Sequence, residues 1–396
     1  MLPLFLTVFI DLLGFGIAIP LLPFYAQRFG AGADTITLLM ATYSLAQFVA
    51  LPYWGRVSDR IGRRPVLLLT LSASIVCWIA IAFADSLVLL FVARGFAGAF
   101  AGNAGVAQAY VADTTTPENR ARGHGMMGAA FGLGFLLGPA IGGLLAGAGG
   151  EHVDYITPFL CAAGLSAVAL IFAATRLPES LSPAARAAAR AQPRQSRLAR
   201  LVDAVTRRGL GVLVALMFLT PFVFSNVETT FALWSQSALG WGPRENGWAY
   251  SFMGLIAVLV QGGSIGPLTR AFGERGLLVI GPVLIGAGML FLPLVGGVAA
   301  LAVSLFLIVA GVCVTTPSVN SLVSQSAAEH ERGSLLGIAQ AAAGLARIAG
   351  PSYGGVVFEN YGRNWPYFTG AALMVAAFVL AFRVRAPALD VPPPRG

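Results

Sequence analysis

Long apolar stretches, separated by short polar ones, follow one another along the whole chain. A helix needs about 20 mainly apolar residues to cross the ~30 Å hydrocarbon layer of a membrane. Stretches of this length that are apolar on every face indicate helices surrounded by lipid or by other helices. We therefore expect an all-α membrane protein with twelve transmembrane helices over residues 2–24, 36–55, 65–84, 87–113, 120–147, 156–175, 209–237, 244–268, 276–295, 298–323, 332–357 and 366–384.

One long interval between these stretches contains no spanning segment. Residues 176–208 are rich in Arg, Ala and Pro, a composition typical of a linker. The linker divides the chain into an N-terminal six-helix bundle over residues 1–175 and a C-terminal six-helix bundle over residues 209–396.

The two predicted bundles carry similar short sequences at a nearly constant spacing. GRVSDRIGRR at 55–64 matches GPLTRAFGER at 266–275 with an offset of 211 residues. GPAIGG at 138–143 matches GPSYGG at 350–355 with an offset of 212. Matches in corresponding places predict an internally duplicated transporter, with its substrate site near the middle of the membrane between the halves.

Composition and charge agree with a membrane protein. The chain is 57% hydrophobic and 11% charged, which leaves too few polar residues to coat a soluble fold. All 25 basic residues are arginines, and twenty of them fall on one side of the predicted membrane. By the positive-inside rule this side, which holds the linker and both termini, is cytoplasmic. The net charge of +8 thus reflects topology and contact with anionic lipids, and we expect no nucleic-acid partner.

Nothing in the sequence indicates an enzyme, a metal site or a cofactor. Cys77, Cys161 and Cys313 lie in apolar stretches without pairing or ligand spacing, and the three histidines lie apart in loops or helix ends. GGSIG at 262–266 fits a nucleophile-elbow pattern around Ser264, but no strand precedes it.

Four charged residues lie well inside predicted spans: Asp11, Arg94, Glu228 and Arg347. A charge at this depth costs about 2.5 to 3.5 kcal/mol on insertion scales, so each is a candidate functional group. An apolar cavity disfavours the ionised form of a carboxylate, as a proton carrier requires. We expect proton coupling from these residues, although Asp11 and Arg94 alternatively form a structural ion pair. Arg347 either holds an anionic substrate group or neutralises Glu228.

Uncharged polar and aromatic residues within the spans are candidates for lining a mostly apolar substrate cavity. Each one is alternatively a helix–helix hydrogen bond or a packing residue. The candidates are Gln47, Asn103, Asn226, Phe231, Trp234, Gln261, Asn320 and Gln340.

Several motifs together resemble one family. The pattern G-x-x-x-D-R-x-G-R-R after the second helix, with two six-helix halves, is similar to the major facilitator superfamily. LGFGIAIPLLP at 13–23, RGFAGAFAG at 94–102 and GFLLGPAIGG at 134–143 resemble the motifs of its proton-coupled drug antiporters. AYVADTTTPENRARGHG at 109–125, with GPLTRAFGER, looks closest to the tetracycline-efflux group.

The resemblance gives the charged loop at 55–64 a role as a conformational latch. In the family this loop braces one state by pairing with an acid at the end of helix 4, which here is Asp113. Arginines that only enforce topology are the alternative. The latch residues are Gly55, Asp59, Arg60, Gly62, Arg63, Arg64 and Asp113.

The resemblance also implies roles for helices 1, 4 and 5. Tetracycline pumps carry an aspartate in helix 1, as Asp11 does here, and the arginine matching Arg94 is tied to proton coupling. The helix-5 motif implies a tight seal against the other half, although small residues also let any two membrane helices approach closely. Its residues are Gly134, Gly138, Pro139, Gly142 and Gly143.

The chain departs from the tetracycline pumps at the residues that carry their proton pathway. Ala257 and Ile285 stand where those pumps have a histidine and an aspartate, and Glu228 stands where they tend to be uncharged. This argues against tetracycline itself as the substrate.

Taken together, the sequence predicts a monomeric, proton-coupled efflux antiporter of the bacterial inner membrane. Its partners are protons, membrane lipids and an amphipathic small-molecule substrate, and it works by alternating access. A flippase for lipid-like amphiphiles, or an uncoupled facilitator of the same fold, is the alternative.

Overall fold

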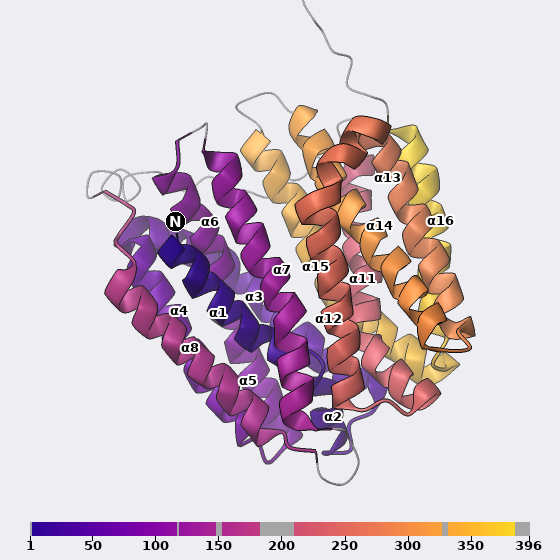
Figure 1. The fold of residues 1–396 in the computed structure, drawn as a ribbon, viewed down its shortest axis with the longest axis horizontal. Helices are drawn as coiled ribbons and strands as arrows, with labels where there is room; N and C mark the ends of the chain where they lie inside the picture. The colour runs from indigo at the N-terminus through magenta and orange to yellow at the C-terminus, as the bar shows by residue number, and fades with distance from the viewer. Residues whose placement is uncertain (1, 117–118, 148–152, 183–209, 327–331, 385–396) are drawn as a thin grey trace, which may run out of the picture.

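The computed structural model describes residues 2–116, 119–147, 153–182, 210–326 and 332–384, and the regular elements in these ranges are all helices (Figure 1). Most of the 176–208 linker lies outside the described residues. The first half consists of α1 (Leu2–Ala18), α2 (Leu22–Gln27), α3 (Ala33–Ile61), α4 (Arg63–Ala82), α5 (Leu87–Ala99), α6 (Asn103–Thr114), α7 (Arg120–Ala146) and α8 (Ile156–Arg176).

The second half begins with α11 and ends with α16 (Figure 1). Its elements are α11 (Leu210–Leu239), α12 (Pro243–Leu259), the π-helical turn η1 (Val260–Ser264), α13 (Ile265–Phe291), the short 3₁₀ turn η2 (Leu292–Leu294), α14 (Val298–Gln325), α15 (Arg332–Tyr361) and α16 (Trp365–Arg383).

The start of α1 and the end of α16 lie at the same end of the molecule (Figure 1). We call this the Gly62 end, because α3 and α4 meet there at Gly62. The opposite end, where α11 is followed by Gly240, is the Gly240 end.

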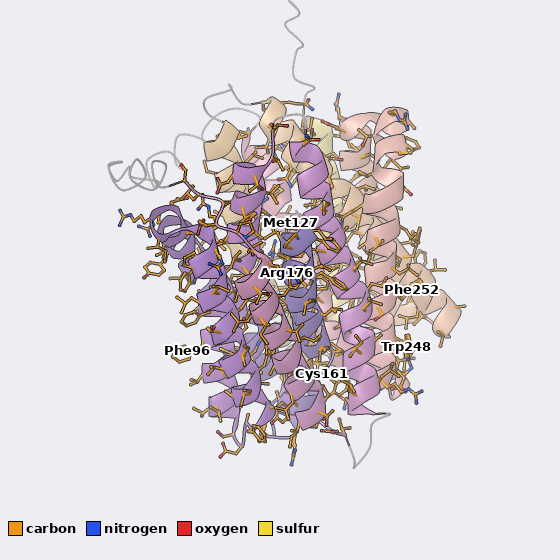
Figure 2. The ribbon with its side chains drawn as sticks, turned by 60° about the vertical axis from the view of Figure 1, so that its left-hand side comes forward. Phe96, Met127, Cys161, Arg176, Trp248 and Phe252 are labelled. Atoms are coloured by element: carbon orange, nitrogen blue, oxygen red, sulfur yellow. The ribbon has the colours of Figure 1, made fainter. Side chains whose placement is uncertain are left out.

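The helices have the length and surface of membrane-spanning elements. Within the described residues, nine helical runs are long and apolar enough to cross a membrane, and the shorter α1 is also apolar. Large apolar side chains face outward, among them Phe96 and Trp248, which are 58% and 53% exposed (Figure 2). In water such exposure would be costly, but in lipid it is the favourable arrangement.

Two glycines show that the internal repeat extends to the backbone. The run Pro243–Leu294 is 52 residues long, about twice what one crossing needs. It is divided at Gly273, whose φ of 67° and ψ of 164° are not helical. Gly62 has a φ of 114° and a ψ of 160° between α3 and α4. These two glycines stand 211 residues apart, in the two copies of the loop motif, and a residue without Cβ adopts such angles at low cost.

The predicted span 87–113 is one crossing built from two helices. α5 ends at Ala99 and α6 begins at Asn103. α3 satisfies the carbonyl groups left free at this break: Trp54 Nε1 donates to Ala99 O at 2.6 Å, and Gln47 Nε2 donates to Ala101 O at 3.4 Å. A side chain in place of Gly102 would collide with Trp54, because its Cβ would lie 2.9 Å from the ring. The break places Asn103 at a helix start in the middle of the bundle.

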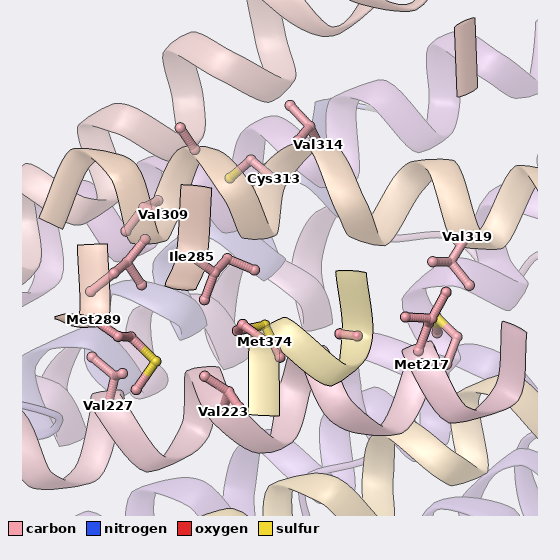
Figure 3. Packing of buried hydrophobic residues seen from close by; sticks show 14 of the residues in the cluster. Met217, Val223, Val227, Ile285, Met289, Val309, Cys313, Val314, Val319 and Met374 are labelled. Atoms are coloured by element: carbon pink, nitrogen blue, oxygen red, sulfur yellow. The ribbon is translucent and has the colours of Figure 1, made fainter. Parts of the chain in front are cut away.

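Each half has its own apolar packing. One buried cluster fills the second half and includes Met217, Val223, Ile285, Met289 and Met374 from three helices (Figure 3). Two further clusters hold the first half together. Rigid packing of this kind fixes the rotation of each helix, and therefore decides which polar side chains face the interior.

Candidate functional site

The carboxylate of Asp11 is held at the centre of the first half by a chain of hydrogen bonds. Asn103 Nδ2 donates to Asp11 Oδ2 at 2.9 Å. The Thr70 hydroxyl donates in turn to Asn103 Oδ1, which fixes the orientation of the amide. Asp11 remains half-buried, so it keeps some accessible surface at mid-membrane depth. The break between α5 and α6 is what brings Asn103 to this carboxylate.

Arg94 lies against an aromatic ring and not against an acid. Its guanidinium carbon is 4.5 Å from the centre of the Tyr43 ring, a cation–π contact, and the residue is 2% exposed. Among the described residues, its Nε and Nη1 have no hydrogen-bond partner. The structural ion pair between Asp11 and Arg94 that the sequence left open is not formed among the described residues.

Glu228 on α11 and Arg347 on α15 complete the group from the second half. The charge of Glu228 interacts with those of Arg347 and Arg94, and Tyr43 interacts with Arg94, Asp11 and Arg347. We call these five residues the central charge cluster. It spans both halves, so the structure brings together the four charged residues that the sequence singles out.

Three predicted substrate contacts lie in the packed core of the second half. Phe231 is 0% exposed and Trp234 is 2% exposed, and Trp234 Nε1 donates to Asn364 at 3.0 Å. Asn226 is 1% exposed and donates to Pro366 O at 3.1 Å. These residues hold α11 against neighbouring elements, so the structure gives a substrate no access to them.

The other predicted contacts differ in accessibility. Gln340 on α15 and Gln261 in the π-helical turn are exposed, and Gln261 Nε2 lies 3.2 Å from Cys313 Sγ. Asn320 is half-buried, and its Oδ1 has no hydrogen-bond partner among the described residues. Gln47 and Asn103 are engaged in the helix break and with Asp11. Gln261 and Gln340 therefore remain the accessible candidates, and Gln261 also lies in a π-helical turn, a feature that often marks functional positions in helices.

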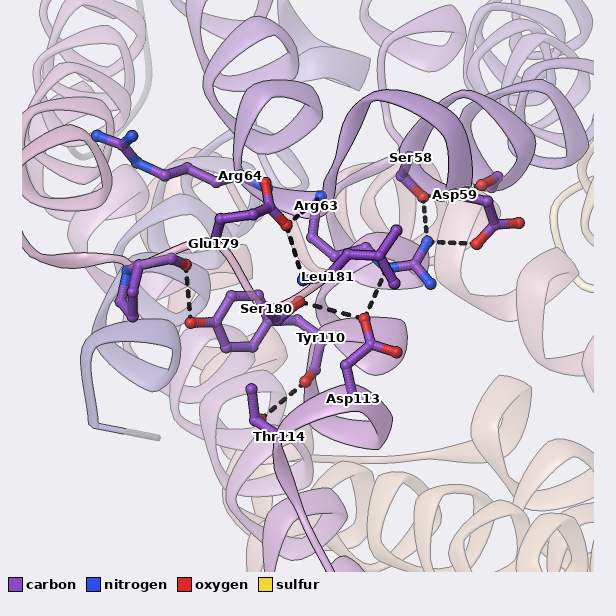
Figure 4. A network of polar contacts seen from close by, with 12 residues as sticks. Ser58, Asp59, Arg63, Arg64, Tyr110, Asp113, Thr114, Glu179, Ser180 and Leu181 are labelled. Carbon is purple, nitrogen blue, oxygen red and sulfur yellow. Dashed lines mark hydrogen bonds and ion pairs between the residues drawn. The ribbon is translucent and has the colours of Figure 1, made fainter. Parts of the chain in front are cut away.

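The latch prediction is refined by the position of Arg63. Its Nη1 contacts Asp59 Oδ1 at 2.5 Å and Ser58 Oγ at 2.7 Å, and its Nε donates to Asp113 Oδ2 at 2.9 Å (Figure 4). Arg63 is 6% exposed, whereas the side chains of Asp59 and Asp113 are 48% and 21% exposed, so a buried guanidinium meets two carboxylates at the edge of the protein interior. The expected partnership of the loop with Asp113 is therefore present, with Arg63 at its centre.

Two residues that sequence reasoning missed support this arrangement. The backbone N–H groups of Arg63 and Arg64 donate to the carboxylate of Glu179 at 2.9 and 3.2 Å. Ser180 Oγ donates to Asp113 Oδ2 at 3.1 Å. Glu179 and Ser180 follow α8, and no spacing in the sequence links them to a loop more than 100 residues away. We call Ser58, Asp59, Arg63, Asp113, Glu179 and Ser180 the Arg63 network.

The remaining residues of the loop motif differ in their surroundings. Arg64 donates from its side chain to Ala174 O at 2.6 Å, and Arg60 is exposed. Gly62 faces the carboxylate of Glu179, which occupies the space that a Cβ would need. Within the described residues, a Cβ at Gly55 would meet no neighbouring atom.

The glycines of the motif at 134–143 lie on α7, the fifth membrane crossing, and form two interfaces. One interface is with α1 of the same half, and the other is with α12 of the second half. Cβ atoms at Gly134 and Gly138 would lie 2.7 to 2.8 Å from Leu12 and Leu13 of α1, in the same half, and Gly142 packs on Ile17. The predicted seal against the other half is made by Gly143 and by the backbone at Pro139, which meet α12. A Cβ at Gly143 would lie 2.8 Å from Pro243 O and 3.1 Å from Gly247 Cα.

Further contacts between the halves lie at the Gly240 end. Gln27 Nε2 donates to Gln236 Oε1 at 2.7 Å, and the backbone N–H of Ala33 donates to Glu359 Oε2 at 2.9 Å. Glu359, on α15, thus caps the first turn of α3, where a negative charge is favoured by the helix dipole. The halves are joined at this end, opposite the Arg63 network.

Comparison with known proteins identifies the family of this arrangement. The model of the Major Facilitator Superfamily matches residues 4–265 and 213–396, which together cover nearly the whole chain. The chain belongs to the major facilitator superfamily. It is therefore a multi-pass membrane transporter and not an enzyme, as the sequence predicts.

The names of the proteins that are similar to this chain mention different substrates. It is 29% identical to the tetracycline resistance protein, class G, of Vibrio anguillarum over 98% of each chain. It is 30% identical to the class C protein of Escherichia coli over 93% of this chain and 92% of the relative. The crystal structure of the human organic anion transporter MFSD10 (TETRAN) aligns with a TM-score of 0.72 and 24% identity, over 96% of this chain and 98% of that one.

Proposed function

We propose that this transporter exports amphipathic small molecules in exchange for protons. The relatives named as tetracycline resistance proteins support drug efflux as the process. Ile285 is fully buried in the core of the second half. It cannot carry a proton, unlike the aspartate that the resemblance to the tetracycline pumps leads us to expect at this position. Because of this difference from the tetracycline pumps, we propose a substrate other than tetracycline.

The observation that carries the proposal is the position of Asp11. Asp11 is half-buried in an apolar bundle, and its carboxylate accepts a hydrogen bond from the neutral amide of Asn103. Such a group can take up and release a proton without breaking an ion pair. We propose Asp11 as the proton carrier, with Glu228 as a second acid and with Arg94 and Arg347 as the charges that couple to both.

Alternating access provides the transport cycle. The two halves are joined at the Gly240 end by backbone-close packing of α7 on α12, and by the bonds of Gln27 and Glu359. These contacts must separate for the opposite state to form, while the Arg63 network stabilises the loop at the other end. By the arginine distribution we place the Gly62 end and both termini in the cytoplasm, and the protein in the inner membrane as a monomer.

The test uses purified protein in proteoliposomes with a pH-sensitive dye trapped inside. Cationic dyes, tetracyclines and lipid-like amphiphiles are added one at a time. We expect substrate-dependent proton movement that is lost in Asp11→Asn. The matched control is Asp85→Asn, which removes an exposed acid in the loop after α4 and should leave the signal unchanged.

Transport without proton movement would contradict the coupling. It would instead identify an uncoupled facilitator or a flippase of the same fold, and would leave Asp11 with a structural role. Coupled transport that persists in Asp11→Asn would assign the proton to Glu228.

A further inference from the structure

Two members of the central charge cluster have no protein partner of their own. Asp11 is bound by Asn103, and Arg94 lies on Tyr43. Among the described residues, the side chains of Glu228 and Arg347 form neither a hydrogen bond nor an ion pair, although their charges interact. Arg347 is exposed and Glu228 is half-buried, so both keep accessible surface. They are an open pair of opposite charges at membrane depth.

Arg347 faces the interior of the molecule and not the lipid. Leu345 and Val356 on the same helix are 48% and 51% exposed and lie about 160° to 180° away from Arg347 around the helix axis. Gly344 and Gly354 lie on the side of Arg347, and they contact Phe48 of α3 and Asn226 of α11. The exposed surface of Arg347 is therefore directed between the two halves, towards Glu228 and Tyr43.

An open pair of this kind requires partners from outside the protein. A charge left unpaired in an apolar surrounding costs more than a charge that is hydrogen-bonded. A ligand with a single charge would pair one of these residues and leave the other unpaired. A ligand with both charges pairs each of them, and its own two charges are then removed from water together.

We propose that Glu228 and Arg347 bind the two poles of a zwitterionic amphiphile. The cationic pole lies on the carboxylate of Glu228, and a carboxylate or similar oxyanion lies on the guanidinium of Arg347, which suits two parallel hydrogen bonds. The proposal rests on the proposed function and adds the class of substrate to it. Because Glu228 holds either a proton or the cationic pole, protons and substrate compete there, as exchange requires.

Aromatic rings around Tyr43, a member of the central charge cluster, suit the apolar body of such a ligand. In the first half, Phe15 lies 5.4 Å from Tyr43 and 6.1 Å from Phe135. Ring faces of this kind favour a flat, aromatic ligand body.

Three dyes that share one xanthene skeleton provide a matched set of probes. Fluorescein is anionic, rhodamine 110 is zwitterionic, and rhodamine 123 is the methyl ester of rhodamine 110 and is cationic. Binding of each to the full chain in lipid nanodiscs is measured by fluorescence anisotropy, without any gradient. We expect rhodamine 110 to bind about ten-fold tighter than either of the other two, since one further charge-assisted bond contributes about that factor.

Substitution of Arg347 and substitution of Glu228 should each remove the preference for rhodamine 110 over a different dye. Arg347→Gln should bring rhodamine 110 down to the affinity of rhodamine 123, whose own binding changes by less than about two-fold, while Arg347→Lys restores part of the difference. Glu228→Gln should remove the preference over fluorescein. Arg244→Gln removes an exposed arginine at the start of α12 and should change none of the three affinities.

Three results would overturn the proposal: equal affinities for the three dyes, equal losses for all dyes in Arg347→Gln, or binding of none of them. Thermal melting of each variant separates a folding defect from a lost contact. Proton movement is not part of this assay, so zwitterion preference without proton exchange contradicts only the proposed function. Proton exchange driven by a cationic dye, with no effect of Arg347→Gln, contradicts only this inference.

Discussion

Arg63 Nε donates to Asp113 Oδ2 at 2.9 Å, and this bond joins the start of α4 to the end of α6. The same guanidinium contacts Asp59 on α3, so one side chain connects three helices. Because Arg63 is 6% exposed, removal of one partner leaves a charge poorly solvated. The loop motif therefore stabilises the first half as well as carrying charge to one side of the membrane.

Because Arg63 and Asp113 bond to each other, we expect substitutions of the two residues to have non-additive effects on the free energy of unfolding. We expect Arg63→Gln and Asp113→Asn each to lower the free energy of unfolding by about 1.5 to 3 kcal/mol, as for hydrogen bonds to charged groups. The double variant should cost less than the sum, because the second substitution removes a group that is already unpaired. Thermal or denaturant unfolding in detergent measures this, with Arg270→Gln, which replaces an exposed arginine in the second copy of the loop motif, as control. Additive losses would mean that the two residues act separately.

Glu179 should matter through the backbone of α4. It accepts the N–H groups of Arg63 and Arg64 at the helix start, the place where a negative charge is favoured. We expect Glu179→Gln to cost a few tenths of a kcal/mol to 1 kcal/mol, because the charge is lost and an acceptor remains. Glu179→Ala should cost more, about 1 to 2 kcal/mol, as for the loss of a helix cap. Equal melting temperatures for both variants and the parent chain would contradict this role.

Gly143 should control closure at the Gly240 end. In Gly143→Ala the new Cβ would lie 2.8 Å from Pro243 O and 3.1 Å from Arg244 Cα, so the halves must move apart. Backbone atoms cannot rotate away as a side chain does, and overpacking of this kind typically costs about 1 to 3 kcal/mol. We expect the closed state to be less populated.

Crosslinking measures this closure. Gln27→Cys and Gln236→Cys replace two side chains whose amides are 2.7 Å apart. A short bifunctional thiol reagent, which spans more than the length of a disulfide, should join the two cysteines in the parent chain and several-fold less in Gly143→Ala. Gly128→Ala is the control, since no atom lies within 4 Å of its Cβ in the described structure. An unchanged yield in Gly143→Ala would show that α7 and α12 adjust without separating.

Asp154, which lies at the Gly240 end, should make the stability of the protein depend on pH in the acidic range. Its Oδ1 accepts from the backbone N–H groups of Ile156 and Thr157 at 2.8 and 3.0 Å, and the hydrogen bonds from Thr157 hold the pKa of this carboxyl below its ordinary value. A lowered pKa in the folded state means that the stabilisation is present above the unfolded pKa, about 3.9. It is lost as the pH falls through that value towards the folded pKa.

We expect the melting temperature of Asp154→Asn to fall less steeply with decreasing pH than that of the parent chain. Asp154→Asn keeps an acceptor for the helix start but cannot titrate, so its melting temperature should be less sensitive to pH between 5 and 3 than that of the parent chain. Parallel pH profiles for the two proteins would contradict the role of Asp154.

The sequence alone determined the class of the protein and the inventory of its charges. Membrane thickness fixes the length of an apolar span, so helices such as α4, α8 and α14 follow from a local pattern. The matching of Gly62 with Gly273 could also be read from the repeat, and both have a positive φ. Charges at membrane depth are rare enough that Asp11, Glu228 and Arg347 stood out without any structure.

Only the tertiary structure decided which groups meet. The rotation of each helix depends on packing against neighbours far away in the chain, and that rotation buries Phe231 and Trp234 while it leaves Arg347 exposed. The break after Ala99 depends on Trp54 of another helix, so a glycine such as Gly102 permits the break but does not fix it by itself. A span's length is a local property of the chain, whereas the partner of a buried polar group is set by long-range packing.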